Sequence, residues 1–216
     1  MITLYSYWRS SAAYRVRIAL NLKGIEYRIA GVNMLKDGGE QHSEAYRAIN
    51  PQGLVPTLDD DGLIITQSMA ILEYLEEQYP DQALLPDEPS QRARARQMAN
   101  LIACDVHPLN NLRVLKYLKA ELELDDEQKN DWYEHWIRLG FAALESSLAN
   151  SSWTGPYCLG NSPGFPDICL VPQMYNAHRF NIKLDDFPRL CQVEQACLAL
   201  QAFRDASPEL QPDAVT

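Results

Sequence analysis

The order of segments in the first third of this chain constrains its fold more than any other feature. Short β-branched and aromatic runs, typical of buried strands, alternate with stretches of helical spacing. A crossover makes the first two expected strands a parallel pair, and a turn at 59–62 joins the last two as an antiparallel hairpin. The predicted order is therefore βαβαββα. The strands are expected at 2–7, 27–29, 55–58 and 63–66. The helices are expected at 12–23, in a short segment that ends near Ile49, and at 68–79.

The pattern changes after residues 80–89, a segment with three prolines that is typical of a linker. Beyond it the hydrophobic spacing is helical almost to the end of the chain. We expect one long helix over about 90–120, a second over 126–148, and others over 167–180 and 188–198. The sequence therefore predicts an α/β domain at residues 1–82 and an all-α domain at 88–216.

Composition narrows the classes of function. The 216 residues carry 19 Lys and Arg against 29 Asp and Glu, and a net charge of −10 argues against nucleic acid or a membrane surface as the main partner. No stretch reaches the ~18 apolar residues of a membrane span, and no leader pattern opens the chain. The five cysteines are widely spaced without C-x-x-C, which indicates reduced thiols in the cytoplasm, and the four histidines lack zinc-ligand spacing, so no metal is expected.

Two adjacent serines mark a candidate anion site. Ser10 and Ser11 stand where a strand ends and a helix begins, and unpaired N–H groups and the helix dipole favour an anion there. A thiolate at this place would have a pKa below the free-thiol value of ~8.5, and a hydroxyl would add a charge-assisted hydrogen bond. From the residues alone, an N-cap is the simpler interpretation of Ser11.

Several motifs, in order along both expected domains, resemble the zeta class of the glutathione transferase family. The resemblance is sharpest at residues 10–20, SSAAYRVRIAL, and extends to NPQGLVP at 50–56, QSMAI at 67–71, HPLNNLR at 107–113 and LVPQ at 170–173. It implies a thioredoxin-like first domain followed by an all-helical one, with glutathione as the cofactor. It also implies a cytoplasmic homodimer.

The resemblance also implies a reaction, the glutathione-dependent cis–trans isomerisation of a maleyl diketo acid by transient thiolate addition. The expected conversion is maleylacetoacetate to fumarylacetoacetate, a step of aromatic amino acid degradation. The alternatives are isomerisation of maleylpyruvate, conjugation or dehalogenation of small acids, and a non-catalytic binding protein.

Two positions depart from the family pattern. Ala12 follows the serine pair where many zeta-class members have cysteine, so chemistry that needs a thiol there is not expected, whereas activation by serine is. Gly164 stands three residues before Asp167 in place of the usual Ser or Thr, so the expected capping box lacks its hydroxyl. Asp167 can still favour the helix start through the helix dipole.

The family pattern implies a set of residues for glutathione. Ser11 would activate the thiol, and Val55 would pair with the cysteinyl backbone at a cis Val55–Pro56 bond. Gln67 and Ser68 would hold the γ-glutamyl carboxylate. From the residues alone, three alternatives remain: the proline bond is trans, Ser68 is only a helix cap, and residues 41 and 42 are exposed loop positions. The whole expected set is Ser10, Ser11, Gln41, His42, Gln52, Val55, Pro56, Gln67, Ser68, His107 and Asn111.

A second set is expected to bind the acidic substrate. Resemblance implies that Arg9, Arg113 and Arg179 grip carboxylates, which suits the planar guanidinium, although surface ion pairs are the simpler interpretation from the residues alone. His107 and Asn111, four residues apart on an expected helix, would share one face of the site, and a core histidine is the alternative. The substrate set is Arg9, Arg113, Arg179 and His107, and the catalytic set is Ser11, Ser10, Arg9 and Arg179.

Overall fold

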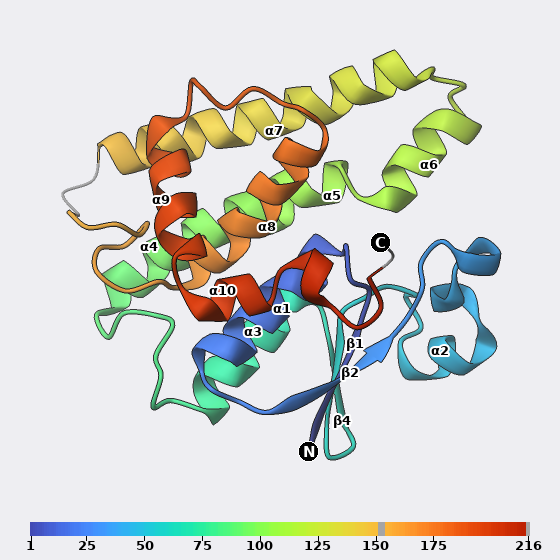
Figure 1. The fold of residues 1–216 in the computed structure, drawn as a ribbon, viewed down its shortest axis with the longest axis horizontal. Coiled ribbons are helices and arrows are strands. Elements are labelled where there is room, and N and C mark those ends of the chain that lie inside the picture. Colours follow the sequence, from blue (N-terminus) through green and yellow to red (C-terminus); the bar gives the residue numbers. More distant parts are fainter. Residues whose placement is uncertain (151–153, 215–216) are drawn as a thin grey trace. The chain divides into compact units, whose positions relative to one another are not determined.

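The computed structural model describes residues 1–150 and 154–214, which form two compact units. The first unit contains Met1–Leu84 together with the C-terminal segment from Leu198 onward, and the second contains Leu85–Cys197. All the described strands belong to the first unit, and the described part of the second is helical (Figure 1). The predicted α/β segment followed by a helical segment is confirmed.

A four-stranded mixed sheet forms the centre of the first unit (Figure 1). Strand β1 (Ile2–Ser6) lies between β2 (Tyr27–Gly31), its parallel partner, and β3 (Thr57–Asp60), which is antiparallel. Strand β4 (Leu63–Thr66) completes the hairpin with β3. Both predicted pairs, β1 with β2 and β3 with β4, are therefore correct, whereas the pairing of β1 with β3 was not predicted. Leu4 and Leu58 face each other at the centre of the sheet, and both are fully buried.

Two helices of this unit pack against each other, α1 (Ser11–Leu22) and α3 (Ser68–Gln78) (Figure 1). Each presents an apolar face whose central side chains are fully buried, with Leu20 on α1 and Leu72 on α3. Helix α1 ends where Gly24 adopts a left-handed φ of 65°, a conformation that glycine supplies without strain. A loop with short turns η1 (Lys36–Gly38) and η2 (Glu40–His42) and helix α2 (Glu44–Ile49) follow β2.

The end of the chain returns to the first unit. Helix α10 (Gln201–Asp205) contacts α1, and the turn η4 (Pro208–Leu210) follows it. Tyr14 donates its hydroxyl to the Phe203 carbonyl at 3.4 Å, and the Arg17 Nε–H donates to the Ala206 carbonyl at 2.9 Å. The sequence placed residues 88–216 in one domain, but residues after Cys197 pack with the first unit because α1 offers these buried donors to their backbone.

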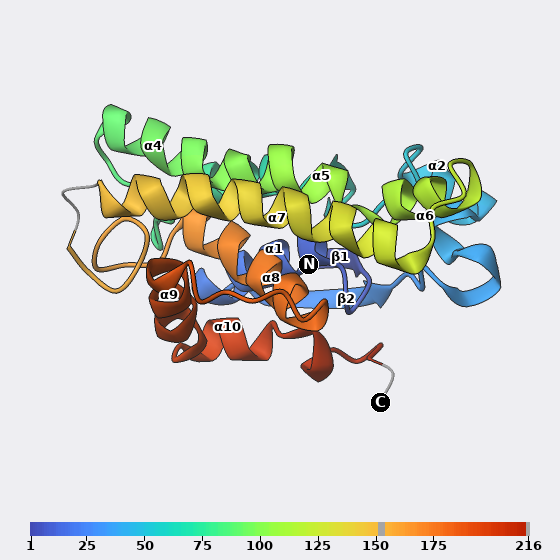
Figure 2. The same ribbon diagram turned by 90° about the horizontal axis from the view of Figure 1, so that it is seen from above.

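The second unit contains six helices and one π-helical turn among its described residues. Helices α4 and α8 lie side by side, and the long helix α7 contacts the π-helical turn η3 (Figures 1 and 2). These elements are α4 (Pro89–Asn100), η3 (Leu101–Val106), α5 (His107–Leu109), α6 (Leu112–Ala120), α7 (Asp126–Ala149), α8 (Phe165–Arg179) and α9 (Pro188–Leu198), the last of which ends in the first unit. Among the described helices, none is both long enough and apolar enough to cross a membrane.

The single long helix predicted over 90–120 is wrong, because the chain breaks into four pieces there. The His107 N–H donates to the carbonyl of Ile102, five residues back, which widens the helix to a π-turn. Pro108 then has no N–H to continue the ladder. Asn111 adopts an extended conformation and starts α6, where its side chain accepts the Arg113 N–H at 3.1 Å.

The start of α8 shows how the chain compensates for Gly164. The Asp167 carboxylate is fully buried and accepts the backbone N–H groups of Gly164 at 2.8 Å and Cys158 at 2.9 Å. Burial raises the pKa of Asp167, while the two N–H donors oppose that shift. Asp167 therefore holds this helix start through two backbone hydrogen bonds, although no side chain at 164 caps the helix.

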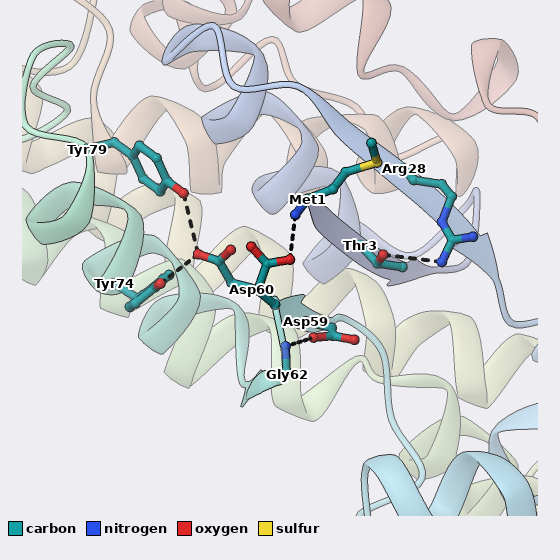
Figure 3. A network of polar contacts seen from close by, with 9 residues as sticks. Met1, Thr3, Arg28, Asp59, Asp60, Gly62, Tyr74 and Tyr79 are labelled. Atoms are coloured by element: carbon teal, nitrogen blue, oxygen red, sulfur yellow. Dashed lines mark hydrogen bonds and ion pairs between the residues drawn. The ribbon is translucent and has the colours of Figure 1, made fainter.

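A polar network ties the hairpin end of the sheet to α3 (Figure 3). Asp60 on β3 accepts hydrogen bonds from the Tyr74 hydroxyl at 2.7 Å and the Tyr79 hydroxyl at 3.4 Å. The amino group of Met1 pairs with Asp61 at 2.6 Å. The Asp60 hydrogen bond raises the pKa of Tyr74 to about 12.

Candidate active site

The start of α1 separates the roles of the two serines. Ser10 has extended backbone angles, and its hydroxyl oxygen accepts the Ala13 N–H at 3.3 Å, so Ser10 is the N-cap. Ser11 is the first helical residue and is only 7% exposed. The interpretation of Ser11 as the N-cap is therefore wrong, because Ser10 has that role and Ser11 is the first residue of the helix.

The turn before β3 is fixed by a cluster of hydrogen bonds. The Leu54 carbonyl accepts from the Tyr46 hydroxyl at 2.6 Å and from the Asn50 amide at 2.8 Å. Both of these side chains also reach the Thr57 hydroxyl, at 3.0 and 3.1 Å. Burial raises the pKa of Tyr46, so its hydroxyl stays protonated as a donor. The Val55–Pro56 bond in this turn is cis, and Val55 precedes the first paired residue of β3, Thr57.

The loop at 41–42 packs against this turn. Gly53 has a φ of 61°, and a Cβ there would lie 2.8 Å from the Gln41 carbonyl, so the close approach requires glycine. Gln41 is 3% exposed, which excludes an exposed loop position for it, whereas His42 is exposed. The buried Oε1 of Gln41 has no hydrogen-bond partner among the described residues. A buried oxygen of this kind suits an N–H donor from a ligand.

The start of α3 carries the next pair of predicted residues. Gln67 has a φ of 71°, which is unusual for a side chain of this size, and its amide donates to Gln52 Oε1 at 2.7 Å. Ser68 is the first helical residue and is buried, so the alternative that Ser68 is a plain cap is wrong. Its hydroxyl oxygen accepts a hydrogen bond from Arg15 Nη1 at 3.2 Å.

These contacts connect the predicted glutathione residues of the first unit. Arg15 joins α1 to α3, the Gln67–Gln52 bond joins α3 to the turn, and Gly53 joins the turn to Gln41. The reasoning from sequence missed Arg15 as a site residue, although it lies one helical turn after Ser11 and inside the motif at 10–20. It also did not predict that Tyr46 and Asn50 hold the Leu54 carbonyl, because no local sequence pattern shows which carbonyl these side chains bind.

The predicted residues of the second unit are distributed over three elements. His107 is half-buried in α5, and Asn111 caps α6. The prediction that the two residues share a face of one helix is therefore wrong, because the helix ends between them. Arg113 is exposed near the start of α6, and Arg179 is exposed at the end of α8.

Arg179 lines a cationic cavity within the second unit. The cavity has a volume of about 290 Å³. Its lining residues are Asn110, Leu112, Leu115, Lys116, Lys119, Lys129, Arg179 and Phe180. Arg113 does not line it. The Arg179 guanidinium lies 4.5 Å from the centre of the Phe180 ring, and that ring stacks on Tyr133. Burial raises the pKa of Tyr133 to about 12, although Arg179 opposes this shift.

Arg9, the third predicted arginine, lies in the first unit directly before the N-cap Ser10. Its guanidinium lies 5.1 Å from the centre of the Trp8 ring. Within residues 1–150 and 154–214, no three His, Cys, Asp or Glu side chains are grouped so that they could hold a metal ion.

Comparison with known proteins supports these observations. The family model "Glutathione S-transferase, N-terminal domain" matches residues 4–86. The "Probable maleylacetoacetate isomerase" of Vibrio cholerae is 49% identical over 213 residues, 99% of this chain and 98% of that protein. A holo structure of maleyl pyruvate isomerase, described as a bacterial glutathione S-transferase of the zeta class, has a TM-score of 0.96 and 44% identity, covering 99% of this chain and 100% of that one.

This chain belongs to the zeta class of the glutathione transferase family. A further similar structure, the maleylacetoacetate isomerase of Methylobacterium extorquens AM1, was solved with malonate and glutathione bound. It has a TM-score of 0.92 and 41% identity, covering 99% of this chain and 100% of that one.

The first unit of this zeta-class chain has donors and acceptors that fit glutathione. A thiolate and a carboxylate are anions, and the starts of α1 and α3 each present a buried serine beside backbone N–H groups. A peptide backbone needs both donors and acceptors, and the Val55 backbone and the unpartnered Gln41 oxygen supply them. The chemistry of the residues present is therefore consistent with this cofactor.

Proposed function

We propose that this chain is a glutathione-dependent cis–trans isomerase of a maleyl diketo acid, converting maleylacetoacetate to fumarylacetoacetate. The observation that carries the proposal is the buried Ser11 hydroxyl in the first turn of α1, beside a separate cap residue. Relatives from Vibrio cholerae and Methylobacterium extorquens AM1 that bear the name of this isomerase support the choice of substrate.

In this proposal the glutathione site lies mainly in the first unit. Ser11 donates to the sulfur, the Val55 backbone pairs with the cysteinyl residue, and Gln67 and Ser68 hold the γ-glutamyl carboxylate. The buried Gln41 supports a direct contact better than the exposed His42 does. The proposed set also contains Ser10, Gln52, Pro56, His107 and Asn111.

When bound, glutathione supplies a thiolate that adds reversibly to the cis double bond, so that the former double bond can rotate. The chain keeps that sulfur ionised. The first N–H groups of α1 and the positive end of its dipole favour the anion, and the Ser11 hydroxyl donates to it. Ser10 supports this geometry because its hydroxyl oxygen accepts the Ala13 N–H and caps the helix.

The proposal assigns the carboxylates of the substrate to arginines. Arg9 belongs to the first unit, and Arg113 and Arg179 belong to the second, with His107 as a further contact. A guanidinium stays charged and binds a carboxylate through two parallel hydrogen bonds, which orients the substrate. The chain carries a net charge of −10, and Lys119 and Lys129 of the cavity pair with Asp126, so the local preference for an acidic ligand rests on Arg179 and Lys116.

We also propose that the protein is a homodimer in the cytoplasm. The family resemblance supports the dimer. The five cysteines are all free thiols, which is what a reducing compartment favours.

The test is turnover of maleylacetoacetate with catalytic amounts of glutathione. Formation of fumarylacetoacetate without consumption of glutathione supports the proposal. Binding of glutathione without turnover rejects the isomerase assignment and favours a binding protein.

Maleylpyruvate is the second candidate substrate, because the structural relative with a TM-score of 0.96 is a maleyl pyruvate isomerase. The ratio of kcat/KM for the two substrates separates the candidates. We expect the higher value for maleylacetoacetate, and a higher value for maleylpyruvate would replace the main assignment.

A further inference from the structure

The backbone of Trp8 is held on both sides by residues far from it in the sequence. Its N–H donates to Asp213 Oδ2 at 2.9 Å, and its carbonyl accepts from Arg17 Nη2 at 2.9 Å. Trp8 is followed directly by Arg9 and by the N-cap Ser10. The loop that leads into α1 is therefore fixed by the last residues of the chain as well as by α1 itself.

Arg17 connects the other parts of this arrangement. Its side chain is fully buried, and the guanidinium also donates to the Ala206 carbonyl at 2.9 Å and to the Ser6 hydroxyl at 3.1 Å. One cation thus joins the end of β1, the loop at Trp8 and the C-terminal segment. Burial lowers the pKa of Arg17 to about 10, and the negative charge of Asp213 opposes that shift, so the group is charged at neutral pH.

Asp213 has a feature that packing alone does not explain. Its Oδ2 accepts the Trp8 N–H, whereas its Oδ1 is buried without a hydrogen-bond partner among the described residues. A carboxylate oxygen that is buried without a hydrogen bond lowers the stability of the fold, and an apolar residue at this position would avoid that loss. A carboxylate does make a stronger bond to a backbone N–H than a neutral acceptor makes.

We propose that Asp213 is a positioning residue for the active site. With Arg17 it holds the Trp8 backbone, so that Arg9 and the serine pair keep one geometry relative to α1. The inference rests on the proposed function, in which Arg9 and Ser11 touch the substrate and the cofactor. Small displacements of such groups are costly in rate, which gives the contact a kinetic consequence.

The experiment compares three full-length variants, Asp213→Ala, Asp213→Asn and the control Asp205→Ala. Asp205 lies in the same C-terminal segment and is exposed, and its side chain accepts a hydrogen bond from the neighbouring Gln201 amide. The readouts are amide hydrogen exchange at residues 8–11, kcat with saturating glutathione and diketo acid, and the thermal midpoint.

For Asp213→Ala we expect amide exchange at residues 8–11 to be about tenfold faster and kcat to be about tenfold lower, as for loss of one charge-assisted hydrogen bond. Asp213→Asn keeps an acceptor oxygen and should recover most of both losses. Asp205→Ala should match the parent protein. If Asp213→Ala does not fold, the comparison of Asp213→Asn with the parent decides, with a two- to threefold effect expected on both readouts.

Parent-like exchange and kcat in Asp213→Ala would overturn the proposal. A lower thermal midpoint with parent-like kcat would also overturn it, because the contact would then be structural only. If the parent protein does not isomerise the diketo acid, the exchange data still decide the role of Asp213, and only the proposed function fails.

Discussion

Ser10 and Ser11 have neighbouring positions but different tasks. Ser10 satisfies the Ala13 N–H, and Ser11 places a buried hydroxyl in the first turn of α1. This division predicts that each serine can be removed with a distinct effect. Loss of the cap should lower stability, whereas loss of the Ser11 hydroxyl should lower activity.

Ser11→Ala should lower kcat by about a hundredfold, the cost of removing one hydrogen-bond donor to a developing or resident anion. The free energy of unfolding should hardly change, because Ser10 still caps the helix. Ser10→Ala is the matched control, with a loss of about 1 kcal/mol in stability and a smaller loss of kcat. Chemical denaturation and steady-state kinetics measure both. Equal kinetic effects of the two substitutions would contradict the division of roles.

Arg15 should act on the glutathione carboxylate through Ser68. Because the Ser68 oxygen accepts from Arg15, the hydroxyl proton is directed elsewhere, and we expect it to point to the γ-glutamyl carboxylate. Arg15→Met should raise KM for glutathione about fivefold to tenfold with little change in kcat. In a double-mutant cycle, Arg15→Met should add little to Ser68→Ala. Additive losses would show that Arg15 acts independently of Ser68.

At the level of elements, the break between α4 and α6 shapes the second unit. The sequence predicts one helix throughout this region. The π-turn and the new cap at Asn111 were not predictable, since they depend on which carbonyls the flanking N–H groups reach. The consequence is that His107 and Asn111 belong to different helices.

Gly140 is the residue of α7 that permits close packing on this break. A Cβ at 140 would lie 2.1 Å from Cγ2 of the buried Val106. Gly140→Ala should therefore destabilise the fold by about 1–3 kcal/mol, although alanine favours an isolated helix by about 1 kcal/mol. Urea denaturation measures this, and Gly140→Ala combined with Val106→Ala should recover part of the loss. A stabilised single variant would show that the two helices are not in this contact.

Tyr133 links α7 to α8 and predicts the response of the fold to alkali. Burial raises its pKa to about 12 from an ordinary value of 10, so the folded state holds the proton more tightly than the unfolded state does. The stabilisation from this residue is complete below pH 10 and is lost as the pH rises towards 12, by about 2–3 kcal/mol. Denaturation between pH 9 and pH 12 should show the loss in the parent and a smaller one in Tyr133→Phe. The same loss in both proteins would contradict the assignment.

For the molecule as a whole, local patterns predicted most of the element order and two of the three strand pairs, but not the pairing of β1 with β3. Strand periodicity predicted the positions of β1 to β4 to within about two residues. The motifs at 10–20 and 67–71 indicated where α1 and α3 of the candidate site begin. The return of the C-terminal segment to α1 was not predicted, because Arg17 and Ala206 are far apart in the sequence and no periodicity relates them. The same reason hid the contact between Trp8 and Asp213.

The central claim is that the start of α1, with the hydroxyl of Ser11, keeps the sulfur of glutathione ionised. Titration of thiolate absorbance for glutathione bound to the protein tests it most directly. We predict a thiol pKa at least about one unit below the free-thiol value of ~8.5, and a return towards that value in Ser11→Ala. A pKa for bound glutathione equal to that in water would contradict the account.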